Sequence, residues 1–512
     1  MPDRLVPATL AFRDDGTLIS PEYGDIYYNV AGAFAQANYV FIAGNRLPAR
    51  WQGRRTFTIV ETGFGTGTNF LATWAAWRDD PARCERLHFV SFEKHPFTRD
   101  DLRRALSHIV AGTTLSEQAT LLADAWPPAV PGFHRIEFEG GRVVLTLALG
   151  DARELLPKLV ARADAFYLDG FAPAKNADLW SADVFRALAR VAADDATFAT
   201  YSSAGVVKQA LVEAGFAYRK MPGLAGKFAM LVGEYAPRWR MRRHEPPRAL
   251  PVAVREAIVI GAGLAGCALV ERLAARGWHV TLIERHAQIA SEASGNPAGV
   301  FHPLMTRDDN VASRLTRSGF LHALARWRAL EHAGHTFARS TRGMIHLAES
   351  ADDFVRMRDA FDALGAPADH VTLLDADAAR AHRFQWHAAA RLCDALLDDA
   401  SLAAPAVGLD FARIDRWLRA RLAEPLRIAD LAAHCGYGMR RFHQLFVDAF
   451  GETPHRYLQR LRLDAAVVLL ADGRHPLVDI AGMVGFADQS TFTHAFTKRF
   501  GVAPGRWRSE RH

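Results

Sequence analysis

The hydrophobic positions along the chain follow different patterns in different regions. In the first half, short apolar runs alternate with longer stretches that have the three-to-four-residue periodicity of helices. The apolar runs predicted to be buried strands are Phe57–Glu61, Leu87–Glu93, Val143–Leu149 and Ala165–Asp169. Alternating strands and helices are typical of a doubly wound, largely parallel sheet. The first region is therefore predicted to be an α/β domain.

A segment without apolar periodicity separates this domain from a second strand–helix unit. Residues 235–251 are rich in Pro and Arg, and a new apolar run begins at Ala257. Beyond about residue 405 only short amphipathic helices are predicted. The order α/β, α/β, all-α predicts three domains with the bounds 1–245, 250–385 and 386–512.

The composition is that of a soluble globular protein. Half of the 512 residues are hydrophobic and 23% are charged, which excludes disordered and collagen-like chains. The longest apolar run, Ala257–Val270, is shorter than the roughly 18 residues that a membrane span needs. The N-terminal residues lack the pattern of a signal peptide. The four widely spaced cysteines offer neither a zinc site nor a disulfide framework, so we expect a cytoplasmic protein without a membrane partner or a metal.

The positive charge of the chain is concentrated near its C-terminal end. Residues 411–512 contain 16 basic and 10 acidic residues, whereas the first 410 residues contain 46 of each. This asymmetry points to a C-terminal segment that meets a polyanion. A solvated basic face would explain the same count.

The first predicted strand leads directly into a glycine-rich turn, TGFGTG, and then into a helix. Glycines at alternate positions let the backbone turn sharply and approach a ligand closely. Carboxylates end or follow the next three predicted strands, and ligands bind at the carboxyl ends of such strands. Four strand-end features in order favour a cofactor site over a structural turn. The candidate residues are Gly63, Gly65, Gly67, Glu93, Asp151 and Asp169.

The segments ETGFGTGTNF, SFEKHPF, GDAREL and YLDGFAPAKNADLW resemble the methyltransferase domain of the bifunctional MnmC family, which modifies the wobble uridine of tRNA. The resemblance covers residues 1–235 and implies a class I fold, S-adenosylmethionine as cofactor, and methylation of the 5-aminomethyl group of 2-thiouridine in tRNA. It implies that Glu61 and the glycines hold the methionine part, Glu93 the ribose and Asp151 the adenine. Asp169 takes the place of the family's catalytic base. An aliphatic amine attacks a methyl group only when neutral, so a carboxylate must orient it and accept a proton.

The second unit carries a dinucleotide-binding fingerprint. The sequence GAGLAG lies between a predicted strand and a helix, and an acid follows 23 residues after its first glycine. In this arrangement the helix N-terminus binds a pyrophosphate and the acid binds the adenosine ribose. With SGNPAG and HPL, the segment resembles the FAD-dependent oxidoreductase half of the same family, which removes the carboxymethyl group from the wobble base. The implied FAD-binding residues are Gly261, Gly263, Gly266, Glu284, Ser294 and Asn296.

This second resemblance ends near Ala381, before the substrate domain and the closing strands that such an oxidase needs. The FAD site is therefore expected to be partial. A fingerprint positions a nucleotide but performs no chemistry. We expect an oxidase remnant without turnover.

The C-terminal region repeats one helical design. Helices at Ile428–Ala432 and Met439–Phe450 are followed by a long helix from Pro454, and the pair recurs at Val478–Met483 and Gln489–Phe500. A helix-turn-helix places its second helix in the major groove of double-stranded DNA. This region, 410–508, resembles the DNA-binding domain of AraC-type transcription regulators. The candidate DNA-binding residues are Arg440, Arg441, His443, Gln444, Gln489, Ser490, Thr491, His494, Lys498 and Arg499.

Two functions from different classes follow. In the first, the chain is a tRNA methyltransferase that uses S-adenosylmethionine and carries an inactive oxidase remnant. In the alternative, it is an AraC-type DNA-binding regulator with passive N-terminal domains. The junction near residue 385 joins a truncated enzyme to a truncated regulator, through a gene fusion or an artefact of sequence assembly. The first function is favoured because the methyltransferase domain is complete.

Overall fold

The computed structural model describes residues 4–238, 252–378 and 411–509, and it leaves single positions and short gaps inside these ranges undescribed. The chain divides into two compact units, Met1–Leu373 and Leu374–His512. Each unit is considered by itself. The domain bounds predicted at 245–250 and at 385–386 lie outside the described residues.

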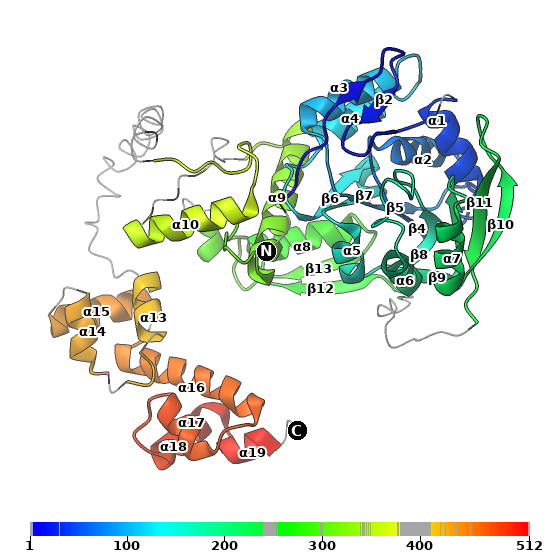
Figure 1. Ribbon diagram of the computed structural model, residues 1–512. Helices are drawn as coiled ribbons and strands as arrows, with labels where there is room; N and C mark the ends of the chain where they lie inside the picture. Colours follow the sequence, from blue (N-terminus) through cyan, green and yellow to red (C-terminus); the bar gives the residue numbers. More distant parts are fainter. Residues whose placement is uncertain are drawn as a thin grey trace. The chain divides into compact units, whose positions relative to one another are not determined.

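The first unit is built on an eight-stranded sheet with the strand order β10-β11-β9-β8-β4-β5-β7-β6 (Figure 1). The five central strands run parallel, whereas β6 and β11 run antiparallel to their neighbours. The sheet is therefore mixed, because strands that were not predicted flank the predicted parallel ones. The strands are β4 (Thr56–Glu61), β5 (Arg86–Glu93), β6 (Gly132–Phe138), β7 (Val143–Leu149), β8 (Ala163–Tyr167), β9 (Ala192–Thr200), β10 (Phe216–Pro222) and β11 (Ala229–Tyr235).

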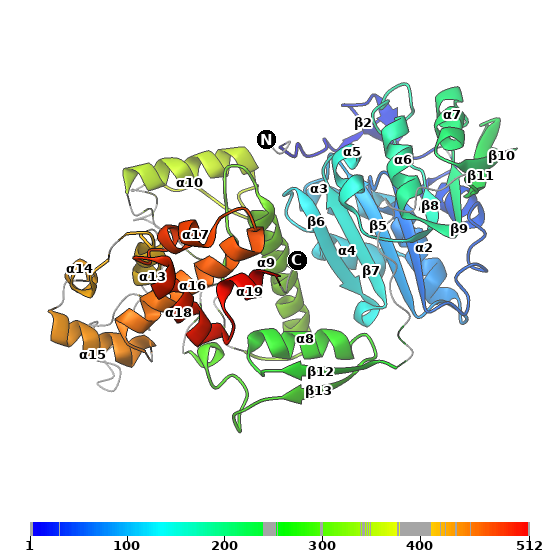
Figure 2. The same ribbon diagram turned by 90° about the horizontal axis from the view of Figure 1, so that it is seen from below.

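Helices cover both faces of this sheet (Figures 1 and 2). Alternate residues of a strand point to opposite faces, so Phe57 and Ile59 of β4 enter one core whereas Val60 enters the other. The first core includes residues of η1 (Ala37–Ala43), α2 (Thr68–Asp79), α3 (Arg99–Ile109) and α4 (Ser116–Asp124). The second includes residues of α5 (Ala152–Leu155), α6 (Ala182–Val191) and α7 (Gly205–Glu213). The doubly wound α/β prediction is confirmed.

The topology brings four predicted site segments to one edge of the sheet. Because β4, β5, β7 and β8 are parallel, their carboxyl ends lie together. Glu61 and Glu93 end their strands, and Asp151 follows β7 by two residues. Strand β8 ends at Tyr167, so Asp169 belongs to the loop after the strand.

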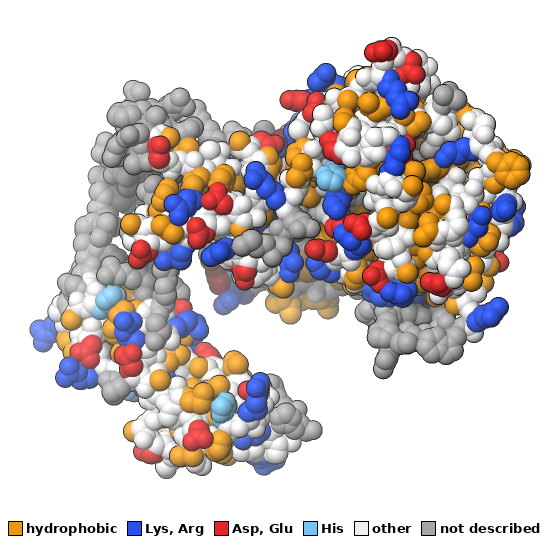
Figure 3. Space-filling model, viewed as in Figure 1, with side chains coloured by type: hydrophobic (Ala, Val, Ile, Leu, Met, Phe, Trp, Pro, Cys, Tyr) orange, Lys and Arg blue, Asp and Glu red, His pale blue; other side chains and the backbone are white. Residues whose placement is uncertain are grey.

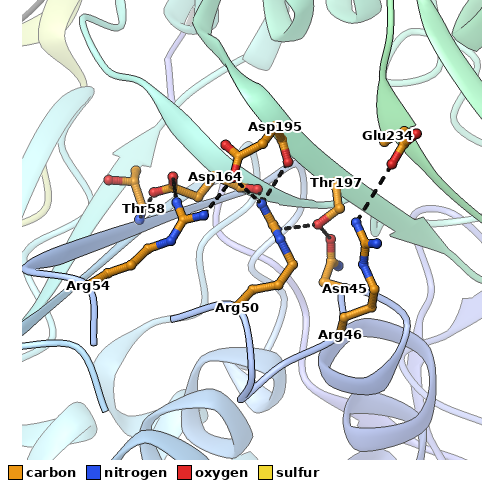
Figure 4. Close-up of polar contacts among 9 residues, drawn as sticks. All are labelled: Asn45, Arg46, Arg50, Arg54, Thr58, Asp164, Asp195, Thr197 and Glu234. Carbon is orange, nitrogen blue, oxygen red and sulfur yellow. Dashed lines mark hydrogen bonds and ion pairs between the residues drawn. The ribbon is translucent and has the colours of Figure 1, made fainter. Parts of the chain in front are cut away.

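The opposite edge of the sheet is closed by ion pairs (Figure 4). Arg54 contacts both Asp164 and Asp195, and Arg50 donates hydrogen bonds to Asp195 and to Thr197. Asp164 also accepts the backbone amide of Thr58 at 2.8 Å. These cations and anions pair with one another, so this network holds the amino ends of the strands together.

The predicted strand–helix–strand unit is present as β12 (Glu256–Ile260), α8 (Leu264–Ala274) and β13 (His279–Ile283). Its two strands are parallel, and among the described residues no third strand joins them. Ile258 and Ile260 of β12 are 69% and 84% exposed. Two longer helices follow, α9 (Val311–His332) and α10 (Ala351–Leu364).

The second unit is helical throughout its described residues. Its elements are α13 (Phe411–Arg419), α14 (Ile428–His434), α15 (Met439–Phe450), α16 (Pro454–Asp472), α17 (Leu477–Met483), α18 (Gln489–Phe500) and α19 (Pro504–Ser509). Helix α16 contributes residues to two small hydrophobic cores. Leu458 and Leu461 lie in the first, and Ala466 and Leu470 lie in the second. The predicted double helix-turn-helix is confirmed as a fold.

Candidate functional site

A cavity of about 290 Å³ opens at the carboxyl edge of the eight-stranded sheet. Its walls come from the turn after β4 and from the ends of β5, β7 and β8. Five of the predicted residues line it, namely Gly63, Gly65, Glu93, Asp151 and Asp169. Glu61 is fully buried, and Gly67 is the N-cap residue before helix α2, in a left-handed conformation with φ 77°. The structure thus brings the predicted residues of the first module together.

The glycine turn is shaped by two close approaches. A Cβ atom at Gly63 would lie 3.1 Å from the backbone oxygen of Asp169. Gly65 has φ +55°, and a Cβ atom there would lie 3.3 Å from the ring of Tyr27. Residues that carry a side chain rarely adopt such a positive backbone angle φ. The turn therefore needs glycine for its conformation and leaves its backbone open to the cavity.

Asn69 links the carboxyl groups of Glu61 and Asp169. Its side-chain amide donates to Glu61 at 2.8 Å and to Asp169 at 2.7 Å. Burial raises the pKa of Glu61 well above its usual range, and the nearby Asp169 adds to this rise. Burial also raises the pKa of Asp169, to about 6. Asn69 lies in the first turn of α2, and the sequence pattern alone did not single it out.

The other two carboxylates have different electrostatic surroundings. Glu93 accepts the backbone amides of Gly65 and His95, both at 2.8 Å, while burial raises its pKa. Burial also opposes ionisation of Asp151, but hydrogen bonds from Arg153 and Lys94 outweigh it and hold its pKa below the usual range. Asp151 is therefore the more strongly ionised of the two.

The N-terminal residues form a wall of the cavity that was not predicted. Tyr23 stacks on Phe171 with ring centroids 4.7 Å apart, and Tyr27 meets the same ring edge-on. The carboxylate of Asp25 accepts the amide of Ala172 at 2.9 Å. These contacts join residues about 150 positions apart in the chain, so no local motif marks them.

A lysine from the hairpin between β10 and β11 reaches the cavity. The Nζ atom of Lys227 lies 3.8 Å from the ring centroid of Tyr201, and both residues line the cavity with Asp169. Burial lowers the pKa of Lys227, against the opposing effect of Asp25 and Asp169. The hydroxyl of Tyr201 donates to the backbone oxygen of Gly170. The Lys227 ammonium group thus lies near the Asp169 carboxylate, which is expected to act as the base.

Local hydrogen bonds and close packing shape the dinucleotide fingerprint of the second module. The Glu284 carboxylate accepts the amide of Ala262 at 2.6 Å, and the Ser294 hydroxyl accepts the amide of Leu264 at 3.1 Å. A Cβ atom at Gly266 would lie 1.8 Å from the backbone oxygen of Gly261, so the helix packs tightly against the turn. Gly263 lies against Ser294, and Asn296 is exposed.

The candidate DNA-binding residues lie on α15 and α18. Most of their side chains are exposed, namely those of Arg440, His443, Gln444, Gln489, Ser490, Thr491, His494 and Lys498. The side chain of Arg441 lies outside the described residues. Arg499 contacts Asp464 at 2.7 Å and donates to the backbone oxygen of Arg460. Arg499 therefore ties α18 to α16.

Family models match three successive segments. Residues 113–236 match the S-adenosyl-L-methionine-dependent methyltransferase model, residues 256–408 the FAD dependent oxidoreductase model, and residues 431–510 the helix-turn-helix domain model. The chain is 82% identical over 383 residues to the tRNA 5-methylaminomethyl-2-thiouridine biosynthesis bifunctional protein MnmC of Burkholderia multivorans. The predicted resemblance is confirmed. It covers 75% of this chain and 58% of that relative.

Further MnmC relatives show the same extent of similarity. The Burkholderia thailandensis protein is 70% identical over 381 residues, again over 58% of its own length. The chain thus spans less than two thirds of the curated relatives that it matches. The solved structure of MNMC2 from Aquifex aeolicus is 25% identical, with a TM-score of 0.37, over 48% of this chain and 73% of that one. Within the described residues, no helix has the length and apolar character to cross a bilayer.

Proposed function

We propose that the first module transfers a methyl group from S-adenosylmethionine to the 5-aminomethyl group of 2-thiouridine at the wobble position of tRNA. The observation that carries this proposal is the convergence of four strand ends on one cavity that contains Asp169. The MnmC relatives are named for the biosynthesis of 5-methylaminomethyl-2-thiouridine in tRNA, and this chemistry needs an amine acceptor and a base.

The residues around the cavity fit S-adenosylmethionine. Gly63 and Gly65 carry no side chain at positions where a Cβ atom would crowd neighbouring atoms. The backbone of this turn is therefore accessible from the cavity. Glu93 would hold the ribose hydroxyls, as acids at the second strand end do in doubly wound sheets. Asp151, kept ionised by Arg153 and Lys94, would accept hydrogen bonds from the adenine amino group. Glu61 ends β4 directly before the glycine turn, and through its effect on this turn it would help to hold the methionine amino group.

In this proposal Asp169 has two tasks. When bound, the cofactor supplies an electrophilic methyl group, and the acceptor nitrogen must then present a lone pair. The Asp169 carboxylate would accept a hydrogen bond from the acceptor amine and take up the proton that this nitrogen loses when the methyl group passes to it and the carbon–sulfur bond of the cofactor breaks. Asn69 and the amide of Gly170 hold this carboxylate in place. The positive charge of Lys227 favours the ionised form of Asp169.

Two measurements on the full chain test this function. Calorimetric titration with S-adenosylmethionine should give saturable binding, and incubation with undermodified tRNA should yield methylated wobble uridine, detected by mass spectrometry of the digested nucleosides. A folded protein that releases no heat on titration would overturn the cofactor assignment. Binding without methyl transfer would overturn the assignment of the acceptor.

We propose that the second module performs no oxidase chemistry, although it carries the residues expected to bind the FAD pyrophosphate and ribose. The two-stranded sheet among its described residues supports this view, because such units hold the flavin ring with residues that return later in the chain. The test is the absorbance of the purified full chain. Stoichiometric bound flavin, with hydrogen peroxide released on carboxymethylaminomethyl-modified tRNA, would contradict it.

A second candidate function is sequence-specific DNA binding by the C-terminal unit. The exposed side chains on α15 and α18 and the match to the helix-turn-helix model favour it. Binding should weaken steeply with salt, because each phosphate contact releases counterions. Retention of a promoter fragment at physiological salt, against retention of tRNA by the same chain, tests which partner dominates.

A further inference from the structure

The hairpin β10–β11 carries an unusually exposed aromatic ring beside the cavity. Phe228 is 95% exposed, which leaves almost the whole apolar ring in water, where it contributes nothing to the core. Its neighbour Lys227 lines the cavity together with Asp169. One residue of this turn therefore faces the site and the next faces solvent.

The topology explains why this turn lies at the mouth of the cavity. Strand β11 runs antiparallel to β9, and Leu231 of β11 is opposite Thr200, the last residue of β9. The start of β11, and the turn before it, therefore lie at the carboxyl edge where the cavity opens. Tyr39 of η1 donates to the backbone oxygen of Pro222 at 3.1 Å and is itself partly exposed. The turn is thus anchored at its base while Phe228 projects.

Basic side chains accompany the exposed ring. Arg219 and Lys220 of β10 are exposed, and Tyr218 beside them is partly exposed. Strand β10 is the outer strand of the sheet, and Figure 3 shows Lys and Arg side chains among hydrophobic ones along this edge. Aromatic rings that stack on bases, combined with cations that meet phosphates, are how proteins bind single-stranded nucleic acid.

We propose that Phe228 stacks on a nucleobase next to the modified nucleotide, while basic side chains of β10 meet the adjoining phosphates, Arg219 from one face of the strand and Lys220 from the other. The proposal rests on the proposed methyltransferase function, because it takes the anticodon loop as the substrate. The target amine must reach Asp169 inside the cavity, whereas Phe228 lies outside it. The ring therefore holds a flanking base. Charge complementarity with the RNA backbone favours this occupant over an apolar protein partner.

The test measures RNA affinity of the full chain with a fluorescein-labelled anticodon stem–loop. Stacking on an aromatic side chain is worth about 1–3 kcal/mol per base, so Phe228→Ala should weaken binding at least about fivefold. Phe228→Trp should retain it. Val160→Ala is the matched control, because Val160 is 70% exposed but precedes β8, at the opposite edge of the sheet. Calorimetric binding of S-adenosylmethionine should be the same in all variants.

Stem–loops with an abasic site on either side of the wobble position complete the experiment. If Phe228 stacks on a flanking base, the penalty of Phe228→Ala should vanish on one of these RNAs. A penalty that persists on both, or unchanged affinity for the intact stem–loop, would overturn the proposal and assign the ring to a protein partner. Methylation of the intact stem–loop by the wild-type chain, measured in parallel, shows whether the underlying function stands. If the wild-type chain does not methylate the intact stem–loop, both the proposed methyltransferase function and the role of Phe228 are overturned.

Discussion

The two α/β modules of the first unit begin alike and end differently. Each has a strand, a glycine turn, a helix and a strand-end acid, with Glu93 in one and Glu284 in the other. In both, the acid accepts backbone amides of its own glycine turn. The first module continues into eight strands with both faces covered, whereas the described part of the second stops at two. The glycine turn is thus a local feature, and a cavity requires the strands that follow it.

The difference is visible in what happens to the apolar strand residues. In the first module Ile59 and Val60 are fully buried on opposite faces of β4. In the second, Val259 on one face of β12 is buried, whereas Ile258 and Ile260 on the other face remain exposed. A hydrophobic run therefore predicts a strand wherever it occurs, while burial depends on the rest of the sheet.

The largest expected contrast between the modules is catalytic. Asp169→Asn should retain S-adenosylmethionine and reduce methyl transfer by about 10²–10⁴-fold, the usual contribution of a positioned base. Glu284→Gln, the matched change at the other fingerprint, should leave methyl transfer unchanged. Both are measured by radiolabelled methyl incorporation into undermodified tRNA. Full activity of Asp169→Asn would remove the carboxylate from its role.

Much of this contrast could be predicted from the sequence because its signals are local. Each of these signals, whether glycine spacing, a strand-end acid or helix periodicity, is contained in a short stretch of sequence. Together they located Gly63, Gly65 and the helices Met439–Phe450 and Gln489–Phe500. Residues that meet the site from distant parts of the chain were not predictable in this way. Tyr23 and Lys227 reach the cavity only because the sheet brings the N-terminal segment and the last hairpin to one edge.

The same limit applies to the helical unit. The pattern placed Arg499 on the second recognition helix, and the helix is there, but the side chain is paired with Asp464 of α16. A charge pattern along one helix does not reveal a partner 35 positions away. Helical periodicity gives the face of a residue, and only the packing of helices gives its partner.

The second prediction compares a strand residue of the first module with one of the second. Phe166 of β8 is fully buried and meets Phe216 edge-on, with centroids 5.7 Å apart. Phe166→Ala should lower the free energy of unfolding by about 3–5 kcal/mol. Ile260→Ala should change it by no more than about 0.5 kcal/mol, because the side chain is already in water. Urea denaturation of the full chain, followed by tryptophan fluorescence, measures both. A comparable loss from Ile260→Ala would show that this face is covered in solution.

The third prediction concerns pH and only the first module. Burial raises the pKa of Asp169 to about 6, and a protonated carboxyl cannot accept the proton of the acceptor amine. Methyl transfer at saturating substrates should therefore fall about tenfold per pH unit below pH 6. Asn69→Ala removes a hydrogen bond to the ionised form, so it should move this midpoint upward. A rate that stays flat from pH 5 to pH 8 would contradict the assignment of Asp169.

The smallest expected effect lies where the two modules touch. Glu137 of the edge strand β6 accepts hydrogen bonds from Arg272 of α8 and from Arg276, which follows this helix. Burial opposes its ionisation, but Arg272, Arg135 of β6 itself and Arg276 together outweigh burial and lower its pKa. This pairing contributes stability at neutral pH, and the contribution is lost as the pH falls through the lowered pKa. Glu137→Gln should therefore destabilise the full chain by about 1 kcal/mol at pH 7.

The pH dependence distinguishes this contact from a general effect of the substitution. The difference in melting temperature between the wild-type chain and Glu137→Gln should shrink as the pH is lowered, because the wild-type carboxyl then loses its charge. Glu117→Gln is the control, since Glu117 pairs with Arg78 on the exposed surface of the first module and should cost less. Equal losses at pH 7 in both variants would mean that the second module gains nothing from β6. A larger loss at Glu137 would show that the second module covers a strand that would otherwise be open to other strands.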